Sequence, residues 1–165
     1  MIGRLFAPLK VDLIFDDRVY RLGETIDIRV GLTARNNLEV REGAVDLVFE
    51  ERFTESEIVM VPSPGSSRSQ MRRWLFLRGP ASAPSLPIPK QVTETRKVRT
   101  VHSSVSFMDS QRMKWGTVLR CDTRLKTDTE PPATTGTIGW KLVATLDLRG
   151  SPDVTGERTI RISPD

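Results

Sequence analysis

Apolar and polar residues alternate along most of this chain, and the alternation is clearest between residues 25 and 34. The apolar residues of this stretch are Ile26, Ile28, Val30, Leu32 and Ala34. A period of two residues is typical of a β-strand that buries one face, whereas an amphipathic helix repeats about every 3.6 residues. The pattern therefore predicts a half-buried strand.

Similar stretches recur between Gly, Pro and Asn turns. They predict further strands at residues 10–15, 19–20, 44–53, 58–61, 91–107, 118–125, 138–148 and 159–162. The apolar parity changes near Arg99, which favours a β-bulge, and Asp109 to Lys114 fits one helical turn. The charged residues 50–52 are expected to face water. About seven to nine antiparallel strands with at most a short helical turn indicate an all-β, immunoglobulin-like two-sheet antiparallel β-sandwich.

Residues 62 to 90 break this pattern, because they contain most of the prolines together with a Gly-Ser-Ser sequence. Proline lacks the amide proton that a central strand donates, so we expect a proline-rich projecting loop at about 62–90. Its apolar stretch, Arg72 to Leu77, is either a strand within the loop or an exposed tip that contacts a partner. We predict that residues 1–165 form a single β-sandwich domain.

The composition is that of a globular protein, with 38% hydrophobic and 28% charged residues, so extensive disorder is not expected. No stretch approaches the roughly 20 apolar residues of a membrane-spanning helix, and the first ten residues lack the apolar core of a secretory signal. The single cysteine, Cys121, cannot form an internal disulfide. We therefore expect a cytoplasmic protein without an integral membrane segment.

The net charge of +4 conceals a strongly basic middle. Residues 68–126 carry 13 Lys or Arg against 3 Asp or Glu, whereas the segments before and after them have an acidic excess. The candidate partner-binding residues are Arg68, Arg72, Arg73, Trp74, Arg78, Arg96, Lys97 and Arg99. If they share one surface with the basic residues of 112–126, a phosphorylated peptide, an anionic lipid or a nucleic acid can bind there. The alternative is a solvated face that offsets the acidic first third.

Few residues could support catalysis, because the chain has one histidine and one cysteine. A nucleophilic dyad or triad would have to use His102. If the strands of His102 and Cys121 paired about a turn near Arg112, the two side chains would lie on opposite faces. We therefore interpret Cys121 as a small buried hydrophobe and His102 as a surface or strand-edge residue. We predict no enzyme activity and no catalytic residues.

Metal and cofactor sites are not predicted either. A structural zinc site needs about four His or Cys ligands, and only two such residues exist. Carboxylates at Asp16-Asp17 and between Asp147 and Asp153 would suit calcium, but acids in turns usually form the turn itself. The sequence also has no Walker loop and no Gly-x-Gly-x-x-Gly after a strand, so no nucleotide cofactor is expected.

Two motifs resemble those of arrestin-fold proteins. The first is Tyr20 to Ile26, in which an aromatic residue and a Gly-Glu turn lead into the alternating strand. The second is Pro131-Pro132 followed by the alternating strand from Gly136 to Leu146, and residues 159–162 fit the closing strand. The order and spacing of these motifs are similar to a single N-lobe-type β-sandwich of the family that includes bacterial sporulation-control proteins and arrestin-domain adaptors.

The resemblance implies adaptor or scaffold work by sheet edges and loops, and it implies no reaction. The main hypothesis is a non-catalytic protein-interaction module whose partner, of unknown identity, binds by strand addition or through the basic loop. Unpaired sheet edges also favour a homodimer. The alternative hypothesis is direct binding of nucleic acid or anionic membrane through residues 68–126.

Overall fold

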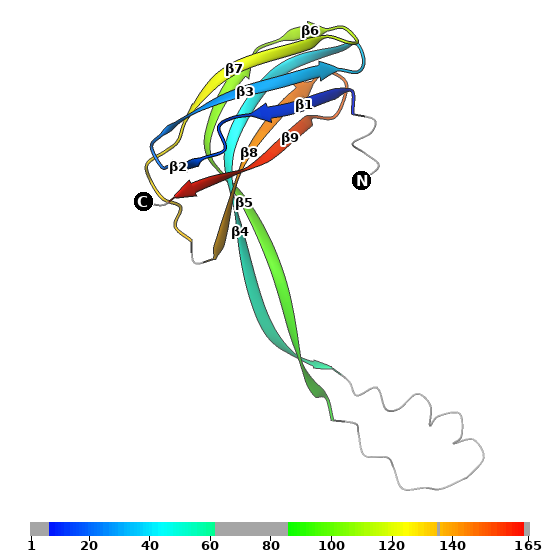
Figure 1. The fold of residues 1–165 in the computed structure, drawn as a ribbon. Coiled ribbons are helices and arrows are strands. Elements are labelled where there is room, and N and C mark those ends of the chain that lie inside the picture. The colour runs from blue at the N-terminus through cyan, green and yellow to red at the C-terminus, as the bar shows by residue number, and fades with distance from the viewer. Residues whose placement is uncertain (1–6, 62–85, 135, 164–165) are drawn as a thin grey trace, which may run out of the picture. The chain divides into compact units, whose positions relative to one another are not determined.

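The computed structural model describes residues 7–61, 86–134 and 136–163, and these residues form strands and turns but no helix (Figure 1). The strands are β1 (Leu9–Ile14), β2 (Val19–Arg21), β3 (Thr25–Ala34), β4 (Leu38–Val61), β5 (Ile88–Met108), β6 (Gln111–Met113), β7 (Val118–Lys126), β8 (Thr137–Leu148) and β9 (Val154–Ser163). One sheet has the strand order β1-β3-β7, and the other has the order β2-β9-β8-β4-β5 with β6 beside β4. The pairing is antiparallel apart from the short β2–β9 pair. The predicted all-β, two-sheet sandwich is confirmed.

The chain divides into two compact units. The first unit consists of Met1–Arg52 and Lys97–Asp165 and contains the sandwich. The second unit is Phe53–Arg96, and its described residues are the end of β4 and the start of β5. Among these described residues, the apolar side chains of Ile58 and Met60 are 71% and 60% exposed. The loop predicted at about 62–90 lies mostly outside the described residues, although β5 already begins at Ile88, so the single-domain organisation stays a prediction.

The core of the sandwich comes from the apolar rows that the two-residue period identifies. On β3 the whole row from Ile26 to Ala34 is at most 2% exposed, and on β8 Leu142, Ala144 and Leu146 are fully buried. Val45 and Leu47 of β4 lie directly opposite Ala144 and Leu142 of β8. The two sheets are therefore held together mainly by branched aliphatic side chains, the principal source of stability in a fold of this kind.

Two local predictions are wrong. The strands predicted at 44–53 and 58–61 are parts of the single strand β4, which has β5 as a second neighbour, and the exposed polar side chains between the two segments conceal the alternation. The helical turn predicted from Asp109 to Lys114 is instead the strand β6, which pairs with the start of β4 and buries Met113 to 2% exposure. In both cases neighbouring strands, rather than local propensity, determine the backbone conformation.

The hydrogen bonds of β5 require a change of parity. Arg99 donates to Glu50, and Ser104 donates to Asp46, although both acids lie on the same face of β4. Arg99 and Ser104 are an odd number of residues apart, so they can share a face only if the alternation is interrupted between them. The expected irregularity therefore lies a few residues after Arg99, and His102 and Ser103 mark it by forming hydrogen bonds with the segment that follows β7.

Candidate functional site

Three of the predicted binding residues, Arg96, Lys97 and Arg99, lie on β5. The other five, Arg68, Arg72, Arg73, Trp74 and Arg78, lie outside the described residues, so their role stays a prediction. Lys97 and Arg99 belong to the sandwich unit, where they contact acidic residues of two other strands, β4 and β9. This meeting point contains the densest group of charges among the described residues.

Glu50 is the centre of the group. The inner row of β4 is apolar, so the next residue along the strand turns its side chain to the outer face of the six-stranded sheet. The residue opposite Glu50 on β8 is Gly139, which adds no side chain. Glu50 is nevertheless only 7% exposed, because long cationic side chains cover it. The sequence-based expectation that residues 50–52 face water is therefore wrong for Glu50.

Four cations surround the Glu50 carboxylate. Arg99 Nε donates to Oε2 at 3.1 Å, and Lys141 Nζ lies 3.7 Å from the same oxygen. Lys97 Nζ and Arg52 Nη2 lie 3.9 Å and 3.8 Å from Oε1. Arg99 holds the carboxylate closely through its hydrogen bond, whereas the other three cations are near the outer limit of an ion pair.

Glu157 of β9 completes the group. Its Oε2 accepts a hydrogen bond from Arg99 Nη1 at 3.3 Å, and its Oε1 accepts one from Lys141 Nζ at 3.3 Å. We call the set Glu50, Arg52, Lys97, Arg99, Lys141 and Glu157 the Glu50 cluster. It has four positive charges and two negative ones, so it carries a formal excess of two positive charges.

Both carboxylates of the cluster are ionised at neutral pH. Burial acts to raise the pKa of Glu50, but the Arg99 hydrogen bond and the nearby Lys141, Lys97 and Arg99 charges outweigh it and lower the pKa. Burial likewise opposes, but does not overcome, the lowering of the Glu157 pKa by Lys141 and Arg99. Carboxylates held in this way are poor proton acceptors, so the cluster is suited to binding an anion rather than to acid–base chemistry.

A shallow groove of about 210 Å³ adjoins the cluster. It is lined by Glu50, Arg52, Thr137, Ile138, Gly139, Trp140, Lys141 and Thr159. A Cβ atom placed on Gly139 would meet no other atom within 4 Å, so there is open space beside the carboxylate. The Arg52 and Lys97 side chains are 60% and 57% exposed, which leaves their charged ends accessible to a ligand in this space.

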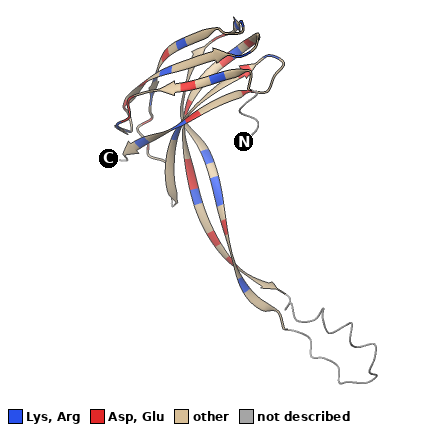
Figure 2. Cartoon of the chain, turned by 45° about the vertical axis from the view of Figure 1, so that its right-hand side comes forward, with Lys and Arg blue, Asp and Glu red and all other residues tan. Residues whose placement is uncertain are grey.

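The basic residues of β7, in the described part of the middle segment, do not join the cluster. Arg120, Arg124 and Lys126 lie on β7 in the three-stranded sheet, where Arg124 pairs with Asp27 at 2.9 Å and Asp122 pairs with Arg29 at 2.7 Å. Figure 2 shows acidic and basic segments next to each other on the strands. In the described part of the chain, the basic middle is thus divided between the two sheets and partly offset by acids.

His102 has a role that the sequence did not indicate. Its ring lies edge-on to Trp140 at 5.2 Å and to Phe49 at 6.4 Å between centroids. Nε2 lies 2.9 Å from the Glu130 carbonyl oxygen, and Nδ1 lies 3.1 Å from Ser103 Oγ. His102 therefore lies on the edge strand of its sheet, as one of the two predicted alternatives had it, and there it is a half-buried packing residue.

The assumed pairing of the His102 and Cys121 strands is wrong. β5 pairs with β4, and β7 pairs with β3 so that Cys121 lies opposite Val30. Cys121 is half-buried, and burial together with the Asp122 charge raises the pKa of its thiol. His102 and Cys121 therefore lie on strands of different sheets, and strand pairing does not bring them together as a Cys-His dyad.

Within residues 7–61, 86–134 and 136–163, no group of three or more His, Cys, Asp or Glu side chains is placed to hold a metal ion. Of the residues considered for calcium, Asp16 and Asp17 have contacts within the fold. Asp17 pairs with Arg161 at 3.0 Å, and the Asp16 carbonyl accepts a hydrogen bond from Tyr20. No helix in this part of the chain is long and apolar enough to cross a membrane.

Comparison with known proteins identifies the fold. No protein-family model and no curated protein matches the chain. Among solved structures, it is similar to Spo0M, the sporulation control protein from Bacillus subtilis, with a TM-score of 0.62 and 14% identity. The match covers 95% of this chain and 50% of Spo0M, so the chain spans about half the length of that protein. AvmM, described as catalysing macrocyclization in alchivemycin A biosynthesis, has a TM-score of only 0.40 at 10% identity, covering 96% of this chain and 91% of that chain.

The fold is that of an arrestin-like β-sandwich, as the Tyr20 and Pro131 motifs led us to expect. Tyr20 is 2% exposed and its hydroxyl donates to the Asp16 carbonyl, while Gly23 adopts a φ of 87° in the turn before β3. That positive φ explains why glycine occupies the turn. The motif residues therefore serve turn formation and packing.

Proposed function

We propose that this chain is a non-catalytic protein-interaction module of adaptor or scaffold type, and that it binds an acidic segment of a partner protein at the Glu50 cluster. The observation that carries the proposal is the positive excess around a buried carboxylate, beside an open groove. A cluster that only had to neutralise Glu50 would need fewer cations. Arg52 and Lys97 are loosely paired and exposed, so they are the groups available to a ligand carboxylate.

An acidic segment of a protein suits the site better than a small anion. The groove is open and lies along a sheet surface, where an extended peptide can place one carboxylate near Arg52 or Lys97 and a second side chain over Gly139. Pairs between exposed charges contribute about 0.2–1 kcal/mol each. Two or three such contacts give weak, salt-sensitive binding, which is typical of a transient adaptor.

Three observations support a role without catalysis. The carboxylates of the cluster are held ionised by hydrogen-bonded cations, both ring nitrogens of His102 have neighbours within hydrogen-bond distance, and Cys121 lies on the other sheet with a raised thiol pKa. None of these groups is prepared to accept a proton or attack a substrate. We retain the cytoplasm as the predicted compartment of this module.

The test is fluorescence anisotropy with a labelled peptide of alternating Glu and Ser residues. Because the double variant Arg52→Gln, Lys97→Gln loses two such contacts, we expect it to bind the peptide about two- to thirtyfold more weakly than the wild type. The buried Glu50 remains paired with Arg99 and Lys141 in this variant. The double variant Lys10→Gln, Arg112→Gln removes the same charge elsewhere in the sandwich and is the matched control. Equal losses in both double variants, or no binding by the wild type, would reject the proposal.

The second candidate function, binding of nucleic acid or anionic membrane, rests on the basic excess of residues 68–126. It requires a continuous basic surface, whereas the described cations of this segment occupy two sheets. Single-stranded DNA and vesicles containing phosphatidylserine are the appropriate probes. Tighter binding of either probe than of the acidic peptide, with an affinity that falls steeply with salt, would favour this second function.

A further inference from the structure

Strand β7 has a free edge. It pairs with β3 on one side, and in the described chain no strand pairs with its other side. The N–H of Thr127 donates to the Glu24 carbonyl at 3.0 Å, and the N–H of Ala34 donates to the Thr117 carbonyl at 2.9 Å. Because hydrogen-bonded and non-hydrogen-bonded pairs alternate, the odd-numbered residues of β7 direct their backbone groups toward β3. The residues whose backbone N–H and C=O groups point to the free edge are Val118, Arg120, Asp122, Arg124 and Lys126.

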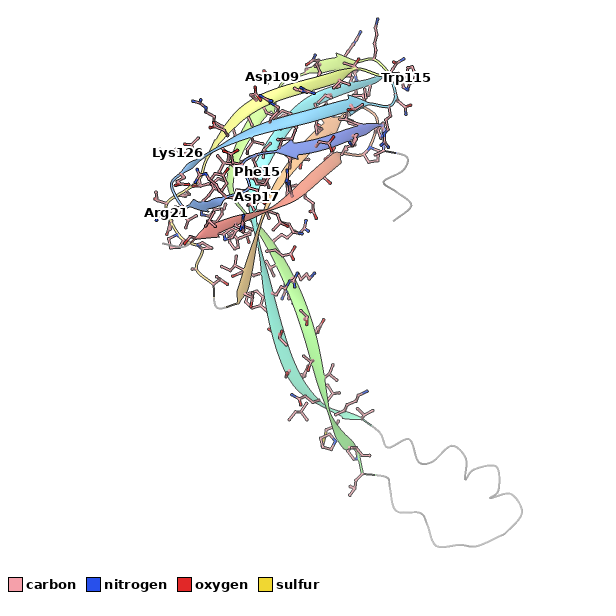
Figure 3. All side chains as sticks on the ribbon, in the orientation of Figure 1. Phe15, Asp17, Arg21, Asp109, Trp115 and Lys126 are labelled. Atoms are coloured by element: carbon pink, nitrogen blue, oxygen red, sulfur yellow. The ribbon has the colours of Figure 1, made fainter. Side chains whose placement is uncertain are left out.

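The other edges of the sandwich unit are less accessible to an added strand. β1 lies against β9, where a Cβ atom on Gly156 would be 3.1 Å from the Val11 carbonyl oxygen. β2 has three residues. The edge of β5 is interrupted where His102 and Ser103 bond to Glu130 and Asp128. β7 therefore offers the longest uninterrupted edge of this unit, and Figure 3 shows its extent between Trp115 and Lys126.

The inner face of β7 is also incompletely covered. Leu119, Cys121 and Thr123 are half-buried, whereas their partners on β3, Leu32, Val30 and Ile28, are at most 2% exposed. A further strand beside β7 would cover this row and continue the sheet. Backbone and side chains thus both leave room for one more strand at the same place.

The charges along the edge are complementary to those of a second copy. We propose that two chains associate through antiparallel pairing of their β7 strands, with Cys121 opposite Cys121 of the second copy. In this register Arg120 lies opposite Asp122 of the second copy, and this contact occurs twice because of the two-fold symmetry. The remaining pairs within the strands, Val118 with Arg124 and Leu119 with Thr123, contain no like charges.

The neighbouring registers are less favourable. A shift that centres the pairing on Asp122 places the two Asp122 side chains together and Arg120 opposite Arg124. Centring on Arg120 places two arginines together. Centring on Thr123 places Asp122 opposite Arg124, but it also places Arg120 opposite Lys126. Like charges directly opposite each other destabilise a pair of strands, so the Cys121 register is selected over these three.

Asp122 can serve both its own chain and the second copy. Its Oδ1 accepts a hydrogen bond from Arg29 Nε at 2.7 Å, while the side chain is 72% exposed. A carboxylate has acceptor sites for several donors, so Arg120 of the second copy can bind without displacing Arg29. Each end of the contact then forms a line of alternating charges across the joined sheets.

Charge exchange tests the register. Arg120→Asp places four acids at the contact, and Asp122→Arg places four arginines there, so we expect each variant alone to dimerise at least about tenfold more weakly than the wild type in sedimentation equilibrium. In an equimolar mixture of the two variants, every Asp faces an Arg, and we expect dimers to return. Circular dichroism verifies that both variants are folded. A wild type that stays monomeric up to about 100 μM, or variants that dimerise alone as well as mixed, would overturn the proposal.

Cysteine cross-linking provides an independent measurement. Residues in a non-hydrogen-bonded antiparallel pair have Cα atoms about 4.5 Å apart, which is within the range of a disulfide. Copper–phenanthroline with oxygen, which accepts the two electrons and two protons of the thiols, should therefore link Cys121 to Cys121 of the second copy. The matched control is Cys121→Ala, Thr123→Cys, whose new thiol faces Leu119 of the second copy and should remain unlinked. Efficient linking only in the control would show a different register and overturn the proposal.

Discussion

Replacing Gly156 with alanine adds one methyl group and tests how closely the two sheets pack at this position. Gly156 lies in β9 of the six-stranded sheet and faces Val11 in β1 of the three-stranded sheet. A Cβ atom at this position would lie 2.9 Å from Val11 Cγ1, 3.0 Å from Val11 Cβ and 3.1 Å from the Val11 carbonyl oxygen. The methyl group of Gly156→Ala would therefore overlap with atoms of Val11 in β1.

The size of the effect follows from these distances. Carbon atoms pack best at about 3.5–4.0 Å, so the new methyl group is roughly 0.6 Å too close to Val11. Rotation of the Val11 side chain moves Cγ1 but neither Cβ nor the backbone oxygen, so the strands themselves must separate. Overpacking of this kind costs about 1–3 kcal/mol in the free energy of unfolding. For a domain of this size, that corresponds to a fall in Tm of roughly 2–12 °C.

The assay is urea unfolding followed by circular dichroism, with Gly139→Ala as the control. A Cβ atom on Gly139 meets nothing within 4 Å, so that substitution should change the free energy of unfolding by less than about 1 kcal/mol. If Gly156→Ala is as stable as the wild type to within about 0.5 kcal/mol, β1 does not pack on β9 in the described way. An equal loss in the control would show that the effect is not one of strand contact.

Further predictions concern the core, the Glu50 cluster and the aromatic group. Leu47→Ala, at a fully buried position, should lower the free energy of unfolding by about 2–5 kcal/mol. Val101→Ala, at a position that is 56% exposed, should lower it by less than about 1 kcal/mol. Urea titration measures both losses, and equal losses would contradict the assigned core. The pKa of Glu50 lies below its ordinary value of 4.5, so its ion pairs stabilise the fold above that pH and are lost as the pH falls through the lowered pKa. The wild type should therefore be more stable than Glu50→Gln at pH 7. Thermal unfolding at several pH values should show this difference in stability narrowing below pH 4.5. A gap that does not depend on pH would refute this assignment. His102→Ala removes the hydrogen-bonded neighbour of Glu130 and the ring beside Trp140. It should therefore lower the free energy of unfolding by about 1–3 kcal/mol and alter the tryptophan emission. Unchanged emission and stability would show that His102 is an ordinary surface residue.

The alternation of apolar residues determined much of the architecture. The rows on β3 and β8 are buried where the period of two places them, and the turn before β3 contains the glycine that its positive φ requires. These features depend on interactions between residues close in the chain, together with the general tendency of apolar surface to leave water. For that reason they can be inferred from the residues in order.

Strand partners and the environment of individual polar residues were decided by the tertiary structure. Glu50 is buried because Lys97, Arg99 and Lys141, from two other strands, cover it, and neither the pairing nor the coverage is visible in the local sequence. His102 likewise becomes a packing residue only because Trp140 lies beside it. A local pattern specifies which face a side chain occupies, but the pairing of distant strands specifies which charges and rings it meets there.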